Sequence, residues 1–294
     1  MTNLQDRRID SGHASSAHCK PHYLWSIHID PVTMKEAVAR VAEWVDSGLR
    51  ECHYVVTPNV DHVVQLYLHA KLRPIYNNAS MILPDGWPLV TMSRFYGKRL
   101  PERVPGSDLL PAIFDDYQKK GKQIKVFLLG GKTGVPERAS ENMQRTWPVI
   151  QVVGTNSPPF GFEKDAAACA KIVHQVNQSN ADLLVLGLGT PKQEFWLNQY
   201  SSQLNVPVAL AIGATIDFIA GEQTRAPMWV RKLKMEWLQR LATNPRRLAK
   251  RYAVDAICFP YICLLELFKK QNEIEEKSVA FKHLQRNSME TSEH

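Results

Sequence analysis

Short apolar runs alternate along the chain with longer segments whose apolar side chains recur at helical spacing. The runs predict six buried strands, at Tyr54–Val56, Met81–Leu83, Lys125–Leu129, Ile150–Val153, Leu183–Leu186 and Val208–Ile212. The segments between them predict helices at Met34–Ser47, Val60–Tyr67, Leu109–Lys119, Val135–Thr146 and Asp165–Gln178. Strands that alternate with helices are typical of βαβ units, so we predict an α/β fold with a Rossmann-like, largely parallel sheet and helices on both faces.

The pattern also divides the chain into four parts. Residues 1–22 are polar and histidine-rich, and we expect a disordered N-terminal tail there. Residues 23–224 hold the strand and helix patterns and form an α/β core. Residues 225–271 form a basic helical appendage with aromatic residues, and residues 272–294 form a polar, solvated tail. The histidines around Cys19 are compatible with a metal site, but a solvated terminus explains them better.

Polar residues follow the predicted strands at the points where the strands end. Ligands of open parallel sheets lie beyond the carboxyl ends of the strands, so these residues are candidates for a binding site. They are Thr57, Asn59, Asp85, Asn156, Gln193 and Asp217. Some have a structural alternative, because Thr57, Asn59 and Asp217 are also suitable helix caps, and Asp85–Gly86 is a common turn pair. Together they predict a pocket at one edge of the sheet.

Two strand ends run into glycine turns, at Gly130–Gly131 and at Gly187–Gly189. Glycines let a backbone approach a ligand closely, and the helix that follows offers N–H groups to an anion. Lys192 fills the third glycine position of the dinucleotide fingerprint, which disfavours NAD. A P-loop is excluded by spacing, since its first glycine position holds Val126. Each turn alone is also explained as a simple strand-to-helix connection, but the two together favour a nucleotide-diphosphate ligand.

Composition narrows the class of protein. With 294 residues, 44% of them hydrophobic, the chain can bury a full core and is globular. Its five cysteines form no CxxC pair, which argues against a disulfide framework or a zinc site and fits a reducing cytoplasm. The start of the chain has no apolar segment of the kind that directs secretion.

The net charge of +7 is concentrated in one segment. Between Arg225 and Arg251 stand nine Lys or Arg residues and a single acidic one. The apolar stretch that follows, Ala253–Phe268, has 16 residues, fewer than the roughly 20 that cross a bilayer. A basic run with Trp229 and Trp237 beside an apolar stretch is typical of a helix on an anionic membrane surface. Nucleic acid is the competing polyanion, but no nucleic-acid-binding signature accompanies the charge, so we expect no such partner.

Six motifs stand in one order between Thr57 and Tyr252. They are TPN, LPDG, ERVPGSD, GLGTPKQEFW, GATIDFIAG and RAPMWVRKLKMEWLQRLATNPRRLAKRY. Together they closely resemble the bacterial WecG/TagA/CpsF glycosyltransferase family. The resemblance implies an inverting enzyme that moves a sugar, N-acetylmannosamine or its uronic acid, from a UDP donor to an undecaprenyl-diphosphate-linked sugar. Such products enter cell-surface polysaccharide or teichoic acid synthesis, so the enzyme is expected in the cytoplasm, peripheral on the inner face of the plasma membrane.

By the same resemblance, Asp85 of the PDG sequence is the catalytic base. One carboxylate suffices, because it takes the proton of the acceptor hydroxyl while UDP leaves without protonation. The departing UDP still needs charge stabilisation, from a divalent metal or from cations and backbone donors. The chain has no DxD motif, and we therefore expect metal-independent chemistry with no cofactor.

The resemblance also assigns binding residues in the core. Thr57, Asn59, Arg103 and Gln193 are implied to bind substrate. The implied nucleotide-binding set is Gly130, Gly131, Phe162, Gly187, Gly189 and Asp217. For Asp217 a ribose hydroxyl is the natural partner, since a carboxylate accepts two hydrogen bonds. Phe162 would stack on the nucleoside, but GTNSPPFGF departs from the glycine–tyrosine form of the family and leaves Phe160 as a rival.

Three cations of the basic segment complete the substrate-binding set that the resemblance implies. They are Arg240, Arg247 and Lys250, whose spacing puts them on one helix face, toward the diphosphate of UDP or of the lipid carrier. Lys250 stands where the family has arginine, and the neighbouring Arg251 is the alternative. The resemblance further implies that the appendage is a mobile lid at the membrane and that a homo-oligomer exchanges with an active monomer.

Two other functions stay open from the residues alone. A non-catalytic adaptor would use the same pocket and basic segment to hold a nucleotide or polyanion at the membrane surface. An NAD-type dehydrogenase is the weaker alternative. Substitution of Asp85 separates the enzyme from the adaptor, and a cofactor-binding measurement tests the dehydrogenase.

Overall fold

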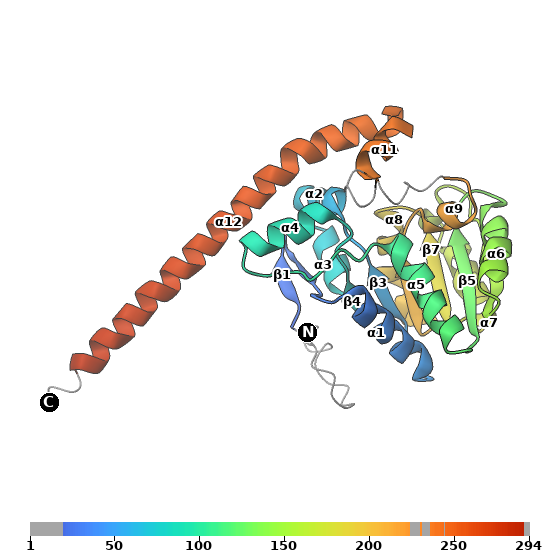
Figure 1. Cartoon of the computed structure of the whole chain (residues 1–294), viewed down its shortest axis with the longest axis horizontal. Helices are drawn as coiled ribbons and strands as arrows, with labels where there is room; N and C mark the ends of the chain where they lie inside the picture. Colours follow the sequence, from blue (N-terminus) through green and yellow to red (C-terminus); the bar gives the residue numbers. More distant parts are fainter. Residues whose placement is uncertain (1–19, 224–229, 231–235, 244, 291–294) are drawn as a thin grey trace.

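A computed structural model of the protein describes residues 20–223, 230, 236–243 and 245–290. Most of the predicted N-terminal tail lies outside these residues, as do Arg225 and Trp229 of the basic segment. The core consists of one sheet between two layers of helices, and a long helix leaves it toward the C-terminus (Figure 1).

The central sheet has six strands in the order β4-β3-β8-β7-β5-β6, and all of its pairings are parallel. The strands are β3 (His53–Val56), β4 (Met81–Ile82), β5 (Ile124–Gly130), β6 (Ile150–Asn156), β7 (Leu183–Gly187) and β8 (Val208–Ala211). Successive side chains point to opposite faces, so Leu184 and Leu186 enter one hydrophobic cluster while Leu183 and Val185 enter the other. Burial on both faces explains why the strands read as continuous apolar runs.

Helices cover both faces, and the predicted fold class is confirmed. One face packs against α1 (Met34–Asp46), α5 (Gly106–Lys119), α6 (Val135–Thr146) and α9 (Thr215–Ile219). The other packs against α2 (Val60–Leu68), α3 (Leu72–Asn77), α4 (Trp87–Phe95), α7 (Ala166–Gln178) and α8 (Lys192–Tyr200). Two short 3₁₀ helices, η2 (Phe162–Lys164) and η3 (Ser201–Gln203), stand in the connections.

A small antiparallel hairpin, β1 (His22–Leu24) with β2 (Ile27–Ile29), precedes the core and begins inside the predicted N-terminal tail. Asp30, directly after it, covers the edge of the short strand β4. Its backbone N–H donates to the carbonyl of Ile82 at 2.9 Å, and its carboxylate accepts from the N–H of Ile82 at 2.8 Å. These bonds satisfy backbone groups on the outer side of β4, the side on which this edge strand has no neighbouring strand.

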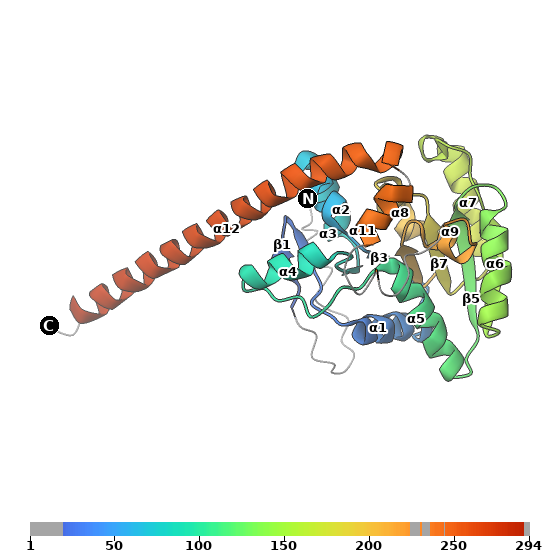
Figure 2. The same ribbon diagram turned by 45° about the horizontal axis from the view of Figure 1, so that its top comes forward.

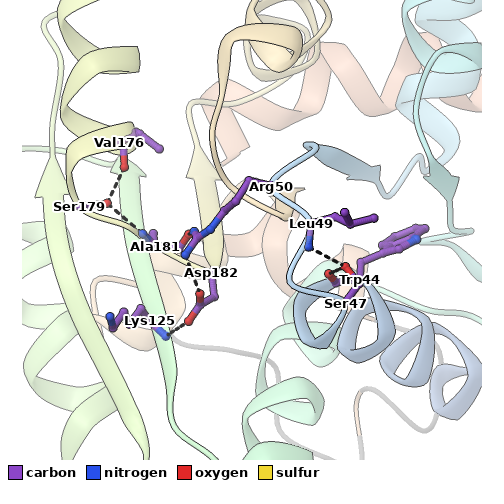
Figure 3. Close-up of polar contacts among 9 residues, drawn as sticks. All are labelled: Trp44, Ser47, Leu49, Arg50, Lys125, Val176, Ser179, Ala181 and Asp182. Atoms are coloured by element: carbon purple, nitrogen blue, oxygen red, sulfur yellow. Dashed lines mark hydrogen bonds and ion pairs between the residues drawn. The ribbon is translucent and has the colours of Figure 1, made fainter.

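A polar cluster ties the strands together at the amino ends of β3, β5 and β7, and Figure 3 shows it. Arg50 donates to the carbonyl of Ala181 at 2.8 Å and pairs with Asp182 at 3.6 Å. The other oxygen of Asp182 accepts from the N–H of Lys125 at 3.0 Å. This end of the sheet is closed by hydrogen bonds within the chain, whereas ligands of such sheets bind at the carboxyl ends.

The appendage is helical in its described part, with α11 (Glu236–Thr243) followed by α12 (Pro245–Glu290). α12 runs through residue 271, the predicted boundary between appendage and tail. It starts beside α2 and then projects away from the core (Figure 1, and from another angle Figure 2). Phe259, Ile262 and Cys263 are buried against the core, and the hydroxyl of Tyr96 donates to the carbonyl of Cys263 at 3.2 Å. Among the described residues, no helix has the length and apolarity to span a bilayer.

Candidate active site

The loops after β3 and β4 lie against each other and bring three predicted site residues together, namely Thr57, Asn59 and Asp85. The backbone N–H of Asp85 donates to the carbonyl of Pro58 at 2.8 Å, which fixes the LPDG loop on the TPN loop. The ERVPGSD loop joins them through the N–H of Val104, which donates to the carbonyl of Pro84 at 2.8 Å. Thr57 is buried and Asp85 is half-buried. The TPN, LPDG and ERVPGSD motifs, which are separated in the sequence, thus lie side by side at this edge of the sheet.

Asn59 caps helix α2, as its structural alternative predicted. Its side-chain oxygen accepts from the N–H of His62 at 3.4 Å, and its own N–H donates to Nδ1 of His62 at 3.2 Å. This reciprocal capping box satisfies N–H groups that the first turn of a helix leaves unpaired. A contact of Asn59 with substrate stays a prediction.

The two predicted glycine turns are in direct contact. Gly130 has φ +115°, and a Cβ there would lie 2.6 Å from the carbonyl carbon and oxygen of Gly187. The N–H of Gly131 donates to the carbonyl of Gly187 at 3.2 Å. Gly189 has φ +79°, and no other described atom lies within 4 Å of the position that a Cβ would take there. The turns therefore need glycine both for backbone conformation and for close approach.

Gln193 and Glu194 lie in the first turn of helix α8, and both are buried, with 2% and 1% of their surface exposed. Nε2 of Gln193 donates to Oε1 of Glu194 at 3.0 Å. The same oxygen accepts from the hydroxyl of Thr190 at 3.2 Å. That hydroxyl also shares a hydrogen bond of 2.7 Å with Nε2 of His62. A polar chain thus connects the cap of α2 with the first turn of α8.

Burial controls the charge states in this chain of side chains. Burial, together with the smaller effect of the positive charge of Arg251, lowers the pKa of His62 to about 3. His62 is therefore a neutral hydrogen-bonding ring at physiological pH. Burial also raises the pKa of Glu194, while hydrogen bonds from Gln193, Thr190 and Tyr76 favour its ionised form.

The predicted nucleoside residues are placed differently from one another. Asp217 lies on α9, directly after β8 and therefore at the same sheet edge, and its carboxylate accepts from Nε2 of Gln223 at 3.1 Å. Phe162 packs into the hydrophobic core beneath η2. Phe160 is 94% exposed, and Nζ of Lys192 lies 3.6 Å from the centre of its ring. The ring that a base can reach in this conformation is that of Phe160, the rival.

A pocket of about 310 Å³ opens beside these residues, between η2 and the start of α8. It is lined by Glu163, Pro191, Lys192, Phe195, Trp196 and Gln199. Lys192 pairs with Glu163 across it at 3.6 Å. Its lining therefore combines apolar side chains with one ion pair.

Arg103 connects the core with the appendage. Its guanidinium pairs with Asp108 at 3.6 Å and with Glu236 of α11 at 3.4 Å. The substrate contact that was predicted for Arg103 stays a prediction, and in this conformation two carboxylates of the chain itself share the guanidinium.

The predicted cations of the appendage are only partly described. The side chains of Arg240 and Arg247 lie outside the described residues, and Lys250 is exposed. Arg251 turns toward the core and pairs with Asp61 of α2 at 3.6 Å. Lys250 and Arg251 are the two candidates for the third predicted substrate-binding cation. Arg251 pairs with Asp61, whereas Lys250 is exposed.

A buried acid, Asp255, stands one turn further along α12. Burial, together with the negative charge of Asp61, raises its pKa to about 6, and Arg251 partly offsets this rise. Ionisation of Asp255 therefore weakens the contact between α12 and α2.

Sequence reasoning missed three polar residues of this edge, namely the half-buried His62 and Thr190 and the buried Glu194. The sequence indicated Asn59 as a cap but gave no role to His62, and a glutamate in the first turn of a helix is usually a solvated partner of the helix dipole. Nothing in the sequence shows that this one is buried. Within the described residues, no group of three or more His, Cys, Asp or Glu side chains is arranged to hold a metal ion.

The family model described as Glycosyl transferase WecG/TagA/CpsF family matches residues 22–273, a span that includes every loop of this edge and the packed part of α12. The chain belongs to this family. The resemblance seen in the sequence motifs is thereby confirmed, and the protein is a glycosyltransferase.

Relatives of the protein share one name, N-acetylglucosaminyldiphosphoundecaprenol N-acetyl-beta-D-mannosaminyltransferase. The one from Bacillus spizizenii is 30% identical over 194 residues, which cover 66% of this chain and 72% of the relative. The one from Bacillus subtilis is 32% identical over 173 residues, or 59% of this chain and 64% of the relative. The one from Staphylococcus aureus is 26% identical over 224 residues, or 76% of this chain and 85% of the relative.

Proposed function

We propose that this protein transfers N-acetylmannosamine, or its uronic acid, from a UDP donor to an undecaprenyl-diphosphate-linked sugar in cell-surface polymer synthesis. The names of the relatives support the donor sugar and the class of acceptor. The observation that carries the proposal is the contact of the TPN and LPDG loops, in which the N–H of Asp85 donates to Pro58 at 2.8 Å. It holds a carboxylate at the sheet edge that also carries the glycine turns, as transfer from a nucleotide donor requires.

In the proposed reaction, Asp85 is the base. The acceptor hydroxyl gives its proton to the Asp85 carboxylate while its oxygen attacks the anomeric carbon from the face opposite UDP. The new C–O bond forms as the bond to the β-phosphate oxygen breaks, so the configuration inverts. UDP takes the bonding electrons and leaves as an anion, and no second carboxylic acid is needed.

The leaving diphosphate is stabilised by donors of the chain itself. The backbone of the Gly130–Gly131 and Gly187–Gly189 turns approaches the phosphates, and Arg240, Arg247 and Lys250 supply positive charge from the appendage. This division of roles makes the reaction independent of a metal ion.

The outer face of α12 is the proposed membrane contact. Ile257, Tyr261, Leu264 and Phe268 are exposed and recur at intervals of four, three and four residues, so they share one helix face. An apolar face with cations such as Lys250 near its start is typical of a helix on an anionic surface. The Ile257→Asp and Leu264→Asp variants should sediment less with phosphatidylglycerol vesicles than the wild type. Sedimentation equal to wild type would contradict this surface.

Transfer assays with a panel of UDP-sugars and a short-chain lipid-diphosphate-GlcNAc acceptor test the function. We expect product from UDP-N-acetylmannosamine or its uronic acid, at a rate that neither EDTA nor added Mg²⁺ changes by more than about twofold. Activity that disappears with EDTA and returns with Mg²⁺ would refute the metal-independent route. No transfer from any donor, with UDP still bound, would favour the non-catalytic adaptor. The implied exchange between oligomer and monomer stays a prediction that sedimentation velocity can check.

A further inference from the structure

Gln193 has a buried carboxamide in which the nitrogen forms a hydrogen bond within the chain and the oxygen does not. Its Nε2 donates to Glu194 at 3.0 Å, whereas its Oε1 is buried and has no hydrogen-bond partner among the described residues. A carbonyl oxygen that is withdrawn from water without a hydrogen-bond partner destabilises the folded state. In this conformation the oxygen has an unused accepting capacity, and a ligand that displaces the covering side chains can satisfy it.

The orientation of this carboxamide is fixed by its neighbours. Oε1 of Glu194 accepts both from Gln193 and from the hydroxyl of Thr190, and it has that accepting role whether or not the carboxyl is ionised. Thr190 is in turn held by Nε2 of His62 at 2.7 Å, and His62 is fixed by the capping box of α2. The amide nitrogen of Gln193 therefore faces Glu194, and its oxygen faces away.

The chemistry of an unpaired accepting oxygen limits the groups that can bind it, because only a hydrogen-bond donor can. A diphosphate has only accepting oxygens at neutral pH and gains nothing from a carbonyl oxygen. A sugar offers hydroxyl groups, and an N-acetylated sugar also offers an acetamido N–H. Entry of such a group must shift the side chains that close Gln193 off, so binding and local opening are coupled.

We propose that Glu194 is a positioning residue that holds Gln193 with its carbonyl oxygen presented to a hydroxyl or acetamido N–H of the transferred or accepting sugar. The inference rests on the proposed function, because it needs a bound sugar. It assigns Gln193 to the sugars and not to the diphosphate, and it gives Thr190 and His62 the task of holding Glu194.

A double-mutant cycle with Gln193→Ala tests the positioning role. Glu194→Gln keeps the shape of the side chain but replaces one of its two accepting oxygens by a donating NH2 group, so the acceptor that faces Gln193 is weaker and no longer fixed. We therefore expect kcat/KM to fall about 10- to 100-fold, which corresponds to about 1.4–2.8 kcal/mol. In the Gln193→Ala background the same change should alter kcat/KM less than twofold. An equal fall in both backgrounds would overturn the proposal, because Glu194 would then act independently of Gln193. Glu141→Gln, an exposed change on α6, is the matched control and should have no effect.

The exchange rate of the Gln193 side-chain amide protons and the transfer rate of the wild type together separate this inference from the function on which it rests. In the protein without ligand, a side-chain amide proton of Gln193 should exchange with water at least tenfold more slowly in the wild type than in Glu194→Gln, as NMR can measure. Equal exchange would overturn the positioning role. A wild type that transfers no sugar would refute the proposed function, while the exchange rates would still decide whether Glu194 holds Gln193.

Binding of UDP alone tests the assignment to the sugar. The Kd of UDP should change less than twofold in Glu194→Gln, and a loss of UDP affinity as large as the loss of kcat/KM would overturn the assignment. If Glu194→Gln does not fold, Thr190→Val replaces it, because it removes only the hydroxyl between His62 and Glu194. It should lower kcat/KM about 3- to 10-fold, again only when Gln193 is present, and an unchanged kcat/KM would count against the proposal.

Discussion

Replacement of Gly130 by alanine should destabilise the protein strongly, because two separate penalties meet at this residue. Its φ of +115° lies in the region that residues with a Cβ avoid, a penalty of about 1–2 kcal/mol. The added Cβ would also lie 2.6 Å from the backbone carbonyl of Gly187, which cannot move aside as a flexible side chain would. Such overpacking adds about 1–3 kcal/mol. We therefore expect Gly130→Ala to lower the free energy of unfolding by about 2–5 kcal/mol.

Gly121→Ala is the matched control, because it isolates the backbone penalty. Gly121 also has a positive φ, +63°, but no described atom lies within 4 Å of its would-be Cβ. Equilibrium urea unfolding, followed by tryptophan fluorescence, should show Gly130→Ala to be less stable than Gly121→Ala by about 1–3 kcal/mol. Calorimetric titration should show loss of UDP binding in Gly130→Ala alone. A difference in stability below about 0.5 kcal/mol would refute the close contact of the two glycine turns.

Three further predictions concern the appendage and the amino end of the sheet. Because the pKa of Asp255 is raised, its ionisation opposes docking of α12 as the pH rises from about 4 to about 6. Asp255→Asn should therefore strengthen docking by up to about 3 kcal/mol above pH 6 and have no effect near pH 4. Amide hydrogen exchange of α12 in the variant and the wild type measures this difference. Phe259→Ala should remove about 3–5 kcal/mol of packing and speed limited proteolysis of α12, and unchanged proteolysis would contradict the docked position. Arg50→Ala should lower stability by about 1 kcal/mol in urea and leave sugar transfer unchanged, so a loss of transfer would show that the far end of the sheet affects the site.

The strands and most of the fold were predictable because their physical cause is visible in the sequence. Leu183–Leu186 is apolar at every position, and this reflects burial on both faces of a parallel sheet. The hairpin of β1 and β2 was not predicted, since its turn uses Trp25 and Ser26 at positive φ where glycine or asparagine is the usual signal. Strand order was also invisible, because it depends on which apolar runs meet in space.

The site was predictable in outline but not in its interactions. Strand ends identified the loops of Asp85 and Gln193, because parallel strands direct their carboxyl ends to one edge. The Glu194 carboxyl is buried where the start of α2 meets the loop before α8, through His62 and Thr190, and no local sequence pattern records such a contact. The exposure of Phe160 and the burial of Phe162 have the same origin, because the packing of η2 on the core cannot be read from the local sequence.

The central claim is that Asp85 is the base of a sugar transfer, and the rate of that transfer in Asp85→Asn tests it most directly. The assay uses UDP-N-acetylmannosamine and the short-chain lipid-diphosphate-GlcNAc acceptor. Asp116→Asn is the control, because Asp116 pairs with Lys120 on the surface of α5. The account predicts that kcat falls about 10²- to 10⁴-fold in Asp85→Asn with UDP affinity retained, and that the control is unchanged. Transfer by Asp85→Asn at the wild-type rate would contradict it.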